Sequence, residues 1–257
     1  MSVIFQENGE TAILQLYREN GYNALDYETI LQLHDSLIKI KDSNFYKTII
    51  ITGSGSKAFT AGADLKERIN MNSKEVQGYL EKARKTYLEI ESLPQPVIAA
   101  VNGLCIGGGL EMSLACDLRI AASHSLFSLP EVRIGIIPGV GGTQRLLRAV
   151  GDLYAKELIL TGKKISAERA LSIGLINETV GDQPVMERAL EIAAEINQNA
   201  PLSVRESKAA INFGRSVTLE EGLLYEAEAY ERVLKTEDRN EALAAFKEKR
   251  KPVFKGR

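Results

Sequence analysis

The chain has 257 residues, of which 44% are hydrophobic and 26% charged, as is typical of a folded protein with a sizeable core. With 32 basic and 34 acidic residues, its formal net charge is -2, which argues against a nucleic-acid-binding protein with an overall positive field. Cys105 and Cys116 lie in apolar stretches without metal-ligand spacing, so we expect buried thiols in a reducing compartment and neither a disulfide nor a metal site.

The ends and apolar runs of the chain set an expectation about its location. Residues 1–7 lack the charged region and following apolar region of a signal peptide. No run approaches the ~20 apolar residues that a membrane span requires. We therefore expect a cytoplasmic protein without a membrane partner.

Several segments in the first half of the chain have the apolar or alternating pattern of β-strands. They are residues 3–5, 12–17, 47–52, 97–101, 118–122 and 126–129. Asn8-Gly9 is typical of a hairpin turn between the first two. Asp26 is the expected N-cap of a helix that ends near Lys41. Small side chains over residues 58–65 predict a loop that a ligand can approach, and residues 66–91 predict a loop and then a helix over that pocket.

From about residue 152 onward, the pattern is almost entirely helical. Ser166, Pro184 and Pro201 mark the expected starts of three helices, and two more are expected over residues 219–236 and 237–250. Strands followed by a helical tail predict an α/β fold. We divide it into a core over residues 1–198 and a helical region over residues 199–257. The tail is amphipathic, so we expect it to pack on a neighbouring subunit.

A run of three glycines, Gly107 to Gly109, lies between the strand 97–101 and a helix expected over residues 110–116. Glycines allow a ligand to approach the backbone closely, and the N–H groups at a helix start favour negative charge. Glu111 follows in the first turn. A carboxylate beside such amides is typical of a catalytic pocket, although the same residues also fit a tightly packed helix start with a surface acid.

Three motifs, in this order, resemble the crotonase superfamily and within it the enoyl-CoA hydratases. They are Ala58-Phe-Thr-Ala-Gly-Ala-Asp64, then Gly107-Gly-Gly-Leu-Glu111, then Leu129-Pro-Glu131 with Gly135-Ile-Ile-Pro-Gly-Val-Gly-Gly-Thr-Gln-Arg145. The similarity runs nearly end to end. It implies a crotonase-like spiral of ββα units with two roughly perpendicular sheets. It also implies a helical C-terminal trimerisation region, and hence a homotrimer or a dimer of trimers.

The resemblance implies that the N–H groups of Ala63 and Gly108 form an oxyanion hole and that Glu111 and Glu131 are the catalytic carboxylates. Water would add to the C2=C3 double bond of a short-chain 2-trans-enoyl-CoA while the two amides stabilise the enolate charge on the thioester oxygen. Two glutamates beside one dry site should push their pKa values apart. We assign Glu111 to the activation of water and Glu131 to the protonation of C2, although both could share one water.

Two acidic residues of the motifs, Glu131 and Asp64, have simpler interpretations when each is considered alone. Glu131 would fit a loop acid paired with Arg133 or Arg145. Asp64 would fit a helix cap, and it can be one while its backbone borders the substrate.

The resemblance further implies an acyl-CoA thioester as the partner, with coenzyme A as part of the substrate and no separate cofactor or metal. Five residues are implied to line the CoA site: Ala24, Ala61, Gly62, Asp64 and Leu65. Phe246 and Lys249, from a neighbouring subunit, would approach the adenine and phosphate end. The alternative for this basic tail is a solvated helix face.

A sharper alternative is a 3-methylglutaconyl-CoA hydratase of leucine degradation. Asp64-Leu-Lys-Glu-Arg68 and Ala245-Phe-Lys-Glu-Lys-Arg250 resemble that branch, whereas Leu129-Pro-Glu131 is closer to the general hydratases. That branch requires a cation for the distal carboxylate of its substrate. Three arginines are available: Arg68, Arg84 and Arg133.

A remote alternative is an RNA-binding homologue, since some members of the methylglutaconyl branch are said to bind AU-rich RNA. The candidate segment, residues 27–47, carries balanced charges and would be a poor surface for phosphates, so nucleic acid is an unlikely partner. The sequence leaves the acyl-chain preference, the pathway and the choice between trimer and hexamer open.

Overall fold

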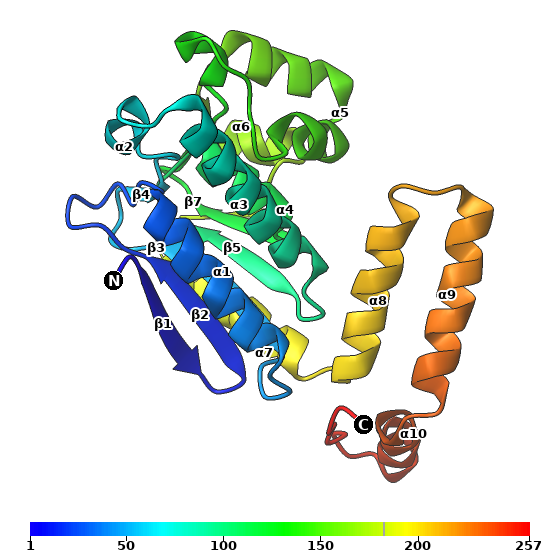
Figure 1. The fold of residues 1–257 in the computed structure, drawn as a ribbon. Helices are drawn as coiled ribbons and strands as arrows, with labels where there is room; N and C mark the ends of the chain where they lie inside the picture. Colours follow the sequence, from blue (N-terminus) through cyan, green and yellow to red (C-terminus); the bar gives the residue numbers. More distant parts are fainter. Residues whose placement is uncertain (182) are drawn as a thin grey trace.

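Two β-sheets organise the α/β part of the chain, in a computed structural model that describes residues 1–181 and 183–257 (Figure 1). Within those residues, the larger sheet has the strand order β1-β2-β3-β5-β7-β10. Its strands are Val3–Asn8, Thr11–Leu16, Thr48–Gly53, Val97–Val101, Leu118–Ala122 and Glu178–Val180. β1 and β2 form an antiparallel hairpin, and all the later neighbours pair in parallel.

The smaller sheet has the order β4-β6-β8-β9. Its strands are Ala58–Thr60, Leu104–Ile106, Leu126–Ser128 and Ile165–Ser166. β4, β6 and β8 run parallel, and β9 is antiparallel to β8. Along the chain, β3, β5 and β7 of the larger sheet are each followed by a strand of the smaller sheet and then by helix. This repeated order is the predicted series of ββα units.

The helices follow these strands or form the C-terminal part of the chain. They are α1 (Tyr27–Lys41), α2 (Leu65–Ile69), α3 (Ser73–Ser92), α4 (Gly108–Ala115), the 3₁₀ helix η1 (Glu131–Ile134), α5 (Gly142–Thr161), α6 (Ala167–Ser172), α7 (Val185–Asn197), α8 (Pro201–Gly214), α9 (Leu219–Leu234) and α10 (Glu237–Glu248). Asp26 caps α1 through its side chain, as predicted.

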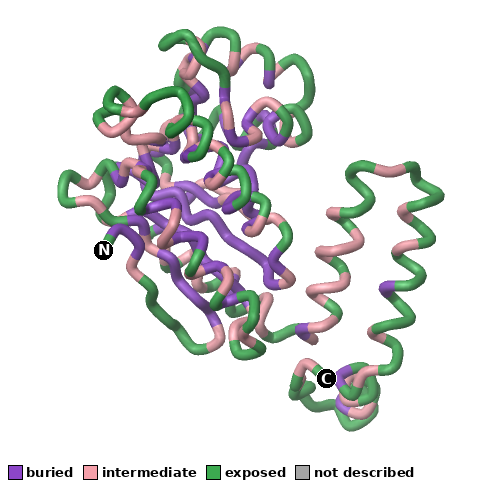
Figure 2. The backbone as a smooth tube through the Cα atoms, in the orientation of Figure 1, coloured by how far each residue is buried: buried purple, intermediate pink, exposed green. Residues whose placement is uncertain are grey.

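Strands β2, β3 and β5 of the larger sheet are buried on both faces, which explains their continuous apolar runs, whereas the edge strand β1 is largely exposed. Ile49 and Ile51 of β3 belong to the core that includes the apolar sides of α1 and α3. Ile50, between them, belongs to a second core that includes the buried side of α7. Figure 2 shows the inner strands of this sheet as long buried stretches. The sheet therefore provides a rigid base for the segments that leave its strands.

Three short elements differ from the sequence-based expectation. Residues 58–65 do not form a loop throughout, because Ala58–Thr60 are β4. The chain does not pass directly from residue 101 to a glycine corner, because β6 intervenes and pairs with both β4 and β8. The loop expected from residue 66 begins as α2, because the Asp64 side chain accepts hydrogen bonds from the N–H groups of Lys66 and Glu67.

Helices α8, α9 and α10 extend away from the α/β part and are mostly exposed (Figures 1 and 2). Several of their large apolar side chains face solvent in the single chain, among them Ile211, Leu219, Leu224, Tyr230 and Phe246. The division of the chain at residue 198 and the packing of this tail on another subunit stay predictions. Among the described helices, none combines the length and the apolar character needed to span a membrane.

Candidate active site

Two backbone N–H groups from separate segments meet at the start of α4. A methyl group built on Gly108 would lie 3.9 Å from the nitrogen of Ala63, and one built on Gly62 would lie 3.3 Å from the nitrogen of Gly108. Within residues 1–181 and 183–257, neither the Ala63 N–H nor the Gly108 N–H donates a hydrogen bond to a protein acceptor. The fold therefore brings together the two amides that the sequence predicted as an oxyanion hole.

A single β-bridge between Leu25 and Ala63 holds the first amide. The N–H of Leu25 donates to the carbonyl of Gly62 at 2.8 Å, and the N–H of Asp64 donates to the carbonyl of Leu25 at 3.0 Å. In this parallel pattern, the Ala63 N–H points away from the bridge and is left for a ligand. Gly62 has φ +88°, and a methyl group there would lie 2.7 Å from the Ile106 carbonyl oxygen, so only glycine fits this approach.

Two buried tyrosines of α3 support the same backbone, and the sequence analysis missed both. The hydroxyl of Tyr79 donates to the carbonyl of Leu25 at 2.9 Å, and that of Tyr87 donates to the carbonyl of Gly108 at 2.8 Å. Burial raises the pKa of both phenols above the ordinary value, so they stay protonated donors. Only their helical spacing of eight residues on one face was visible in the sequence.

Glu111 is buried in the first turn of α4, with a relative exposure of 2%. Its Oε1 accepts hydrogen bonds from the N–H groups of Val140 and Gly142, each at 2.8 Å. Burial raises the pKa of Glu111, and these two amides oppose the rise. No hydrogen bond to Oε2 is found within the described residues, so this oxygen is the one available to a water molecule.

Glu131, at the start of η1, directs its carboxyl group toward the glycine run. A methyl group on Gly107 would lie 2.9 Å from Oε1 of Glu131. Oε2 is buried and has no hydrogen-bond partner in the described part of the chain. Burial raises the pKa of Glu131 to about 7, and the negative charge of Glu111 adds to the rise. At neutral pH, this carboxyl group is therefore close to half protonated and can donate a proton.

The simpler interpretation of Glu131 as one half of an ion pair is wrong. Arg133 donates to the carbonyl of Thr161 at 3.2 and 3.3 Å. Arg145 forms its ion pair with Glu91 at 2.9 Å. The interpretation of Asp64 as a helix cap is confirmed, since it caps α2.

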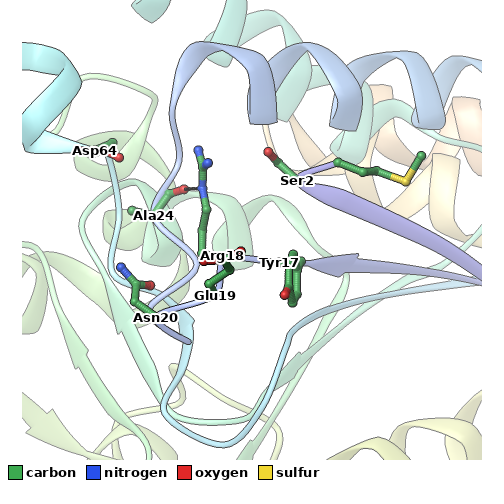
Figure 3. Close-up of a pocket in the computed structure, with 8 residues that line it drawn as sticks. Ser2, Tyr17, Arg18, Glu19, Asn20, Ala24 and Asp64 are labelled. Carbon is green, nitrogen blue, oxygen red and sulfur yellow. Dashed lines mark hydrogen bonds between the residues drawn. The ribbon is translucent and has the colours of Figure 1, made fainter.

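The residues predicted to bind CoA lie in two places on the chain. Ala24 and Asp64 line one hollow of about 470 Å³ together with Arg18 and the N-terminus (Figure 3). Arg18 supports this hollow by donating through Nε to the carbonyl of Ala24 at 3.2 Å. Ala61 and Gly62 lie between β4 and Ala63, and Leu65 is 55% exposed at the start of α2. All five predicted residues lie within two positions along the chain of Ala63 or of its bridge partner Leu25, and their contact with CoA stays a prediction.

Phe246 and Lys249 lie at the end of α10, which Figure 1 shows apart from the α/β part of the same chain. Phe246 is 86% exposed. The single chain therefore does not bring these two residues to Glu111 and Glu131. Their predicted role requires the tail of another subunit and stays a prediction.

Within residues 1–181 and 183–257, no three His, Cys, Asp or Glu side chains cluster in a way that would hold a metal ion. Cys105 and Cys116 are buried free thiols, and burial raises the pKa of each to about 12. Neither thiol therefore has the low pKa of a nucleophile. The expectation that the reaction needs no separate cofactor stays a prediction.

Comparisons of sequence and of fold relate this chain to known proteins. Residues 6–257 match the sequence profile of the enoyl-CoA hydratase/isomerase family. The crystal structure of an enoyl-CoA hydratase from Bacillus anthracis superposes with a TM-score of 0.98 at 45% identity, over 100% of both chains. The short-chain-enoyl-CoA hydratase of Clostridium acetobutylicum is 42% identical over 97% of this chain and 96% of its own. The methylglutaconyl-CoA hydratase of Mus musculus is 42% identical over 98% of this chain and 81% of its own.

Proposed function

Because the chain belongs to the enoyl-CoA hydratase/isomerase family, we propose that it adds water reversibly to the C2=C3 double bond of a short-chain 2-trans-enoyl-CoA, in the syn sense. The predicted family, fold class and enzyme class, a hydro-lyase acting on an acyl-CoA thioester, are confirmed by the comparisons. The observation that carries the detailed proposal is the convergence at the start of α4 of the buried Glu111, the half-buried Glu131 and two amides that have no acceptor within the described residues.

The amides of Ala63 and Gly108 bind the thioester carbonyl oxygen. As water adds to C3, negative charge moves onto this oxygen to give an enolate. Donors fixed before the reaction stabilise such charge without reorganisation, and one donor of this kind contributes about 3–4 kcal/mol in other enzymes. The Gly108 N–H also lies at the N-terminus of α4, where the helix dipole favours a negative charge.

Glu111 and Glu131 handle the protons. Glu111 holds the water through its free oxygen and accepts a proton from it as the water oxygen bonds to C3. Glu131, whose pKa is raised to about 7 by burial, gives its proton to C2 as the enolate collapses. One proton moves onto Glu111 and one leaves Glu131, so proton exchange with solvent restores the starting state.

Separate Glu111→Gln and Glu131→Gln substitutions test this mechanism with crotonyl-CoA. Each keeps the shape of the side chain and removes its ability to accept or give a proton, so we expect kcat to fall by about 10²–10⁴-fold. The matched control is Glu168→Gln, an exposed glutamate at the start of α6, which should keep wild-type turnover. Near wild-type hydration by either active-site variant would refute the mechanism.

A second candidate substrate, 3-methylglutaconyl-CoA, is favoured by the position of Arg68. Its Nη1 is buried and has no hydrogen-bond partner in the described residues. Its guanidinium lies 4.6 Å from the ring centroid of Tyr79, the residue that supports the bridge beside Ala63. A buried donor without an acceptor suits a carboxylate at the far end of an acyl group. The mouse relative carries the name of that activity.

Hydration of crotonyl-CoA and 3-methylglutaconyl-CoA by wild type and Arg68→Met separates the two candidates. Loss of a charged hydrogen bond should raise KM for the dicarboxylic substrate by about 10- to 100-fold and spare crotonyl-CoA. Arg169→Met is the matched control, since Arg169 also stacks on a tyrosine, Tyr154, but lies on α6. Equal effects of Arg68→Met on both substrates would remove the distal-carboxylate role.

We also propose that the protein is a homotrimer or a dimer of trimers and that it is cytoplasmic. In this assembly, two subunits would share each CoA site. The apolar side chains exposed on α8–α10 support the oligomer. The RNA-binding alternative stays untested, and the balanced charge of the chain does not favour it.

A further inference from the structure

Glu111 depends on a segment outside its own helix. Its Oε1 is held by the N–H groups of Val140 and Gly142, which belong to residues 138–142, the segment that leads from η1 into the first residue of α5. A displacement of this segment would release the carboxylate from both hydrogen bonds. The question is therefore which groups fix residues 138–142.

Two arginines hold consecutive carbonyl groups of this segment. Arg84 of α3 donates through Nε to the carbonyl of Gly139 at 2.7 Å. Arg145 of α5 donates through Nη1 to the carbonyl of Val140 at 2.9 Å. The segment is thus tied to α3 and α5 at the residues beside those that hold Glu111.

Arg145 is itself aligned by Glu91 near the end of α3. Its Nε and Nη2 donate to Oε2 of Glu91 at 3.1 and 2.9 Å. Arg145 is 9% exposed, so the arginine side of this ion pair is shielded from water, while Glu91 is partly exposed. Gly141 has φ +106°, and a methyl group there would lie 2.3 Å from Nη1 of Arg145. The backbone at residue 141 therefore leaves room for this guanidinium.

We propose that Arg145, aligned by Glu91, is a positioning residue for the water-activating carboxylate of Glu111, and that Arg84 is a second, more exposed one. This inference rests on the proposed hydratase function. The arginines do not contact substrate. They fix the carbonyls of Gly139 and Val140, and through the same segment they fix the N–H groups that hold Glu111.

The positive charges of the two arginines favour the ionised form of Glu111, as do the two backbone hydrogen bonds that the arginines hold in place. Charged and titratable groups act on Glu111 from three elements: Tyr79, Tyr87 and Arg84 from α3, Glu131 from η1, and Arg145 from α5. Burial raises the pKa of Glu111, and the charges of Arg145 and Arg84 oppose that rise. No nearby cation in the described residues opposes the effect of burial on Glu131, and the pKa of this carboxyl group rises to about 7. The arginines therefore favour an ionised Glu111 beside a protonated Glu131.

Steady-state hydration of crotonyl-CoA across pH tests the inference. Arg145→Gln removes both the geometry and the charge, so kcat should fall about 10- to 100-fold with little change in KM. The acid limb of the kcat profile should move to higher pH, because Glu111 then ionises less readily. Arg145→Lys keeps the positive charge but cannot form all the hydrogen bonds of the guanidinium to Glu91 and Val140. Its kcat should therefore fall while the acid limb stays near the wild-type position. Arg84→Gln should have the same effects as Arg145→Gln, to a smaller degree.

The matched control is Arg148→Gln, one turn further along α5. Arg148 is exposed and, among the described residues, donates hydrogen bonds to the backbone and side chain of Gln144 alone, so both kcat and the acid limb should stay at wild-type values. Wild-type kcat and pH profile in Arg145→Gln would overturn the inference. If Arg145→Gln fails to fold, Glu91→Gln and Arg84→Gln carry the test, and unchanged profiles in both would overturn it equally. A wild-type enzyme that does not hydrate crotonyl-CoA would instead refute the proposed function.

Discussion

At the residue scale, the site separates two chemically identical side chains by their surroundings. Glu111 receives two backbone donors and lies near two arginines, whereas Glu131 keeps a buried oxygen without a partner in the part of the chain that the structure describes. The difference decides which carboxyl group is ionised and which holds a proton near neutral pH. Such a site lowers the stability of the folded chain, because the unpartnered acid is buried for catalysis and not for packing.

The stability of the protein should therefore depend on Glu131 in a pH-dependent way. Its pKa is raised in the folded chain from 4.5 to about 7 by burial. Between these two pH values the unfolded chain has lost this proton while the folded chain keeps it, so the free energy of unfolding falls as pH rises through the window and levels off above it. We expect Glu131→Gln to be about 2 kcal/mol more stable than wild type at pH 8, and equal to it at pH 4.

Denaturant unfolding of both proteins at the two pH values measures this difference. Glu168→Gln again serves as the control, because its carboxyl group is exposed on α6. An equal stability of Glu131→Gln and wild type at pH 8 would show that the raised pKa has been assigned to the wrong group.

The sequence predicted the residues of this site that lie inside continuous motifs. Ala63, Gly108, Glu111 and Glu131 each stand in a short stretch whose spacing is fixed along the chain. Four supporting residues were not identified in these roles: Tyr79, Tyr87, Arg84 and Arg145. Their contacts join positions 21 to 55 residues apart or link a side chain to a backbone carbonyl, as in the Arg84 bond to Gly139. No pattern along the chain encodes such a contact, since any residue type offers a carbonyl.

At the element scale, the short strands of the smaller sheet position the catalytic backbone. β6 brings the glycine run against β4, and its pairing with β8 brings Glu131 to the same place. Strands of two or three residues are too short to show a periodic pattern, so β4, β6, β9 and β10 were not predicted. The equally short β8 was predicted, because its residues form an apolar run between turn residues. Longer elements such as α1 and β5 were placed correctly, because their apolar patterns extend over several turns or a whole buried strand.

Alanine substitutions of the two adjacent glycines of α4, Gly108 and Gly109, should distinguish an effect on catalysis from an effect on packing. A methyl group on Gly109 would lie 2.5 Å from Cγ2 of Thr60 and 2.8 Å from its carbonyl oxygen, so Gly109→Ala should lower the free energy of unfolding by about 1–3 kcal/mol. A methyl group on Gly108 meets nothing closer than 3.6 Å, so Gly108→Ala should fold normally. The same methyl group lies 3.9 Å from the Ala63 nitrogen, beside the expected oxygen site.

Thermal unfolding and crotonyl-CoA hydration, measured on both variants, check these expectations. Gly108→Ala should keep its melting temperature and lose at least about tenfold in kcat/KM, because the methyl group crowds the oxyanion. A stable and fully active Gly108→Ala would place the thioester oxygen elsewhere.

At the scale of the whole molecule, the C-terminal helices expose the apolar surface that the single chain leaves uncovered. Leu219 and Leu224 of α9 are 78% and 69% exposed. Large apolar side chains exposed along several turns indicate an interface, and the amphipathic pattern of the tail predicted one from the sequence. The sequence could not indicate which face a neighbour covers, because that depends on how whole helices pack between subunits.

The substitution Leu224→Glu should therefore dissociate the expected trimer into single chains, since it places a charge in an apolar contact. Sedimentation velocity measures the mass. KM for crotonyl-CoA should rise in parallel, because Phe246 and Lys249 of a neighbouring subunit would no longer reach the CoA site. Leu153→Glu is the matched control, since Leu153 lies on α5 and is 80% exposed. An unchanged mass for Leu224→Glu would exclude this face from the interface.

The most direct test of the proposed active site is a crystal structure of the protein with a slowly reacting enoyl-CoA analogue bound. The account predicts a thioester oxygen within about 3.2 Å of both the Ala63 and Gly108 nitrogens. It also predicts that C2 and C3 lie between the carboxyl groups of Glu111 and Glu131. A thioester oxygen remote from either amide would contradict the account. So would an acyl group that contacts only one of the two glutamates while the other faces a different cavity.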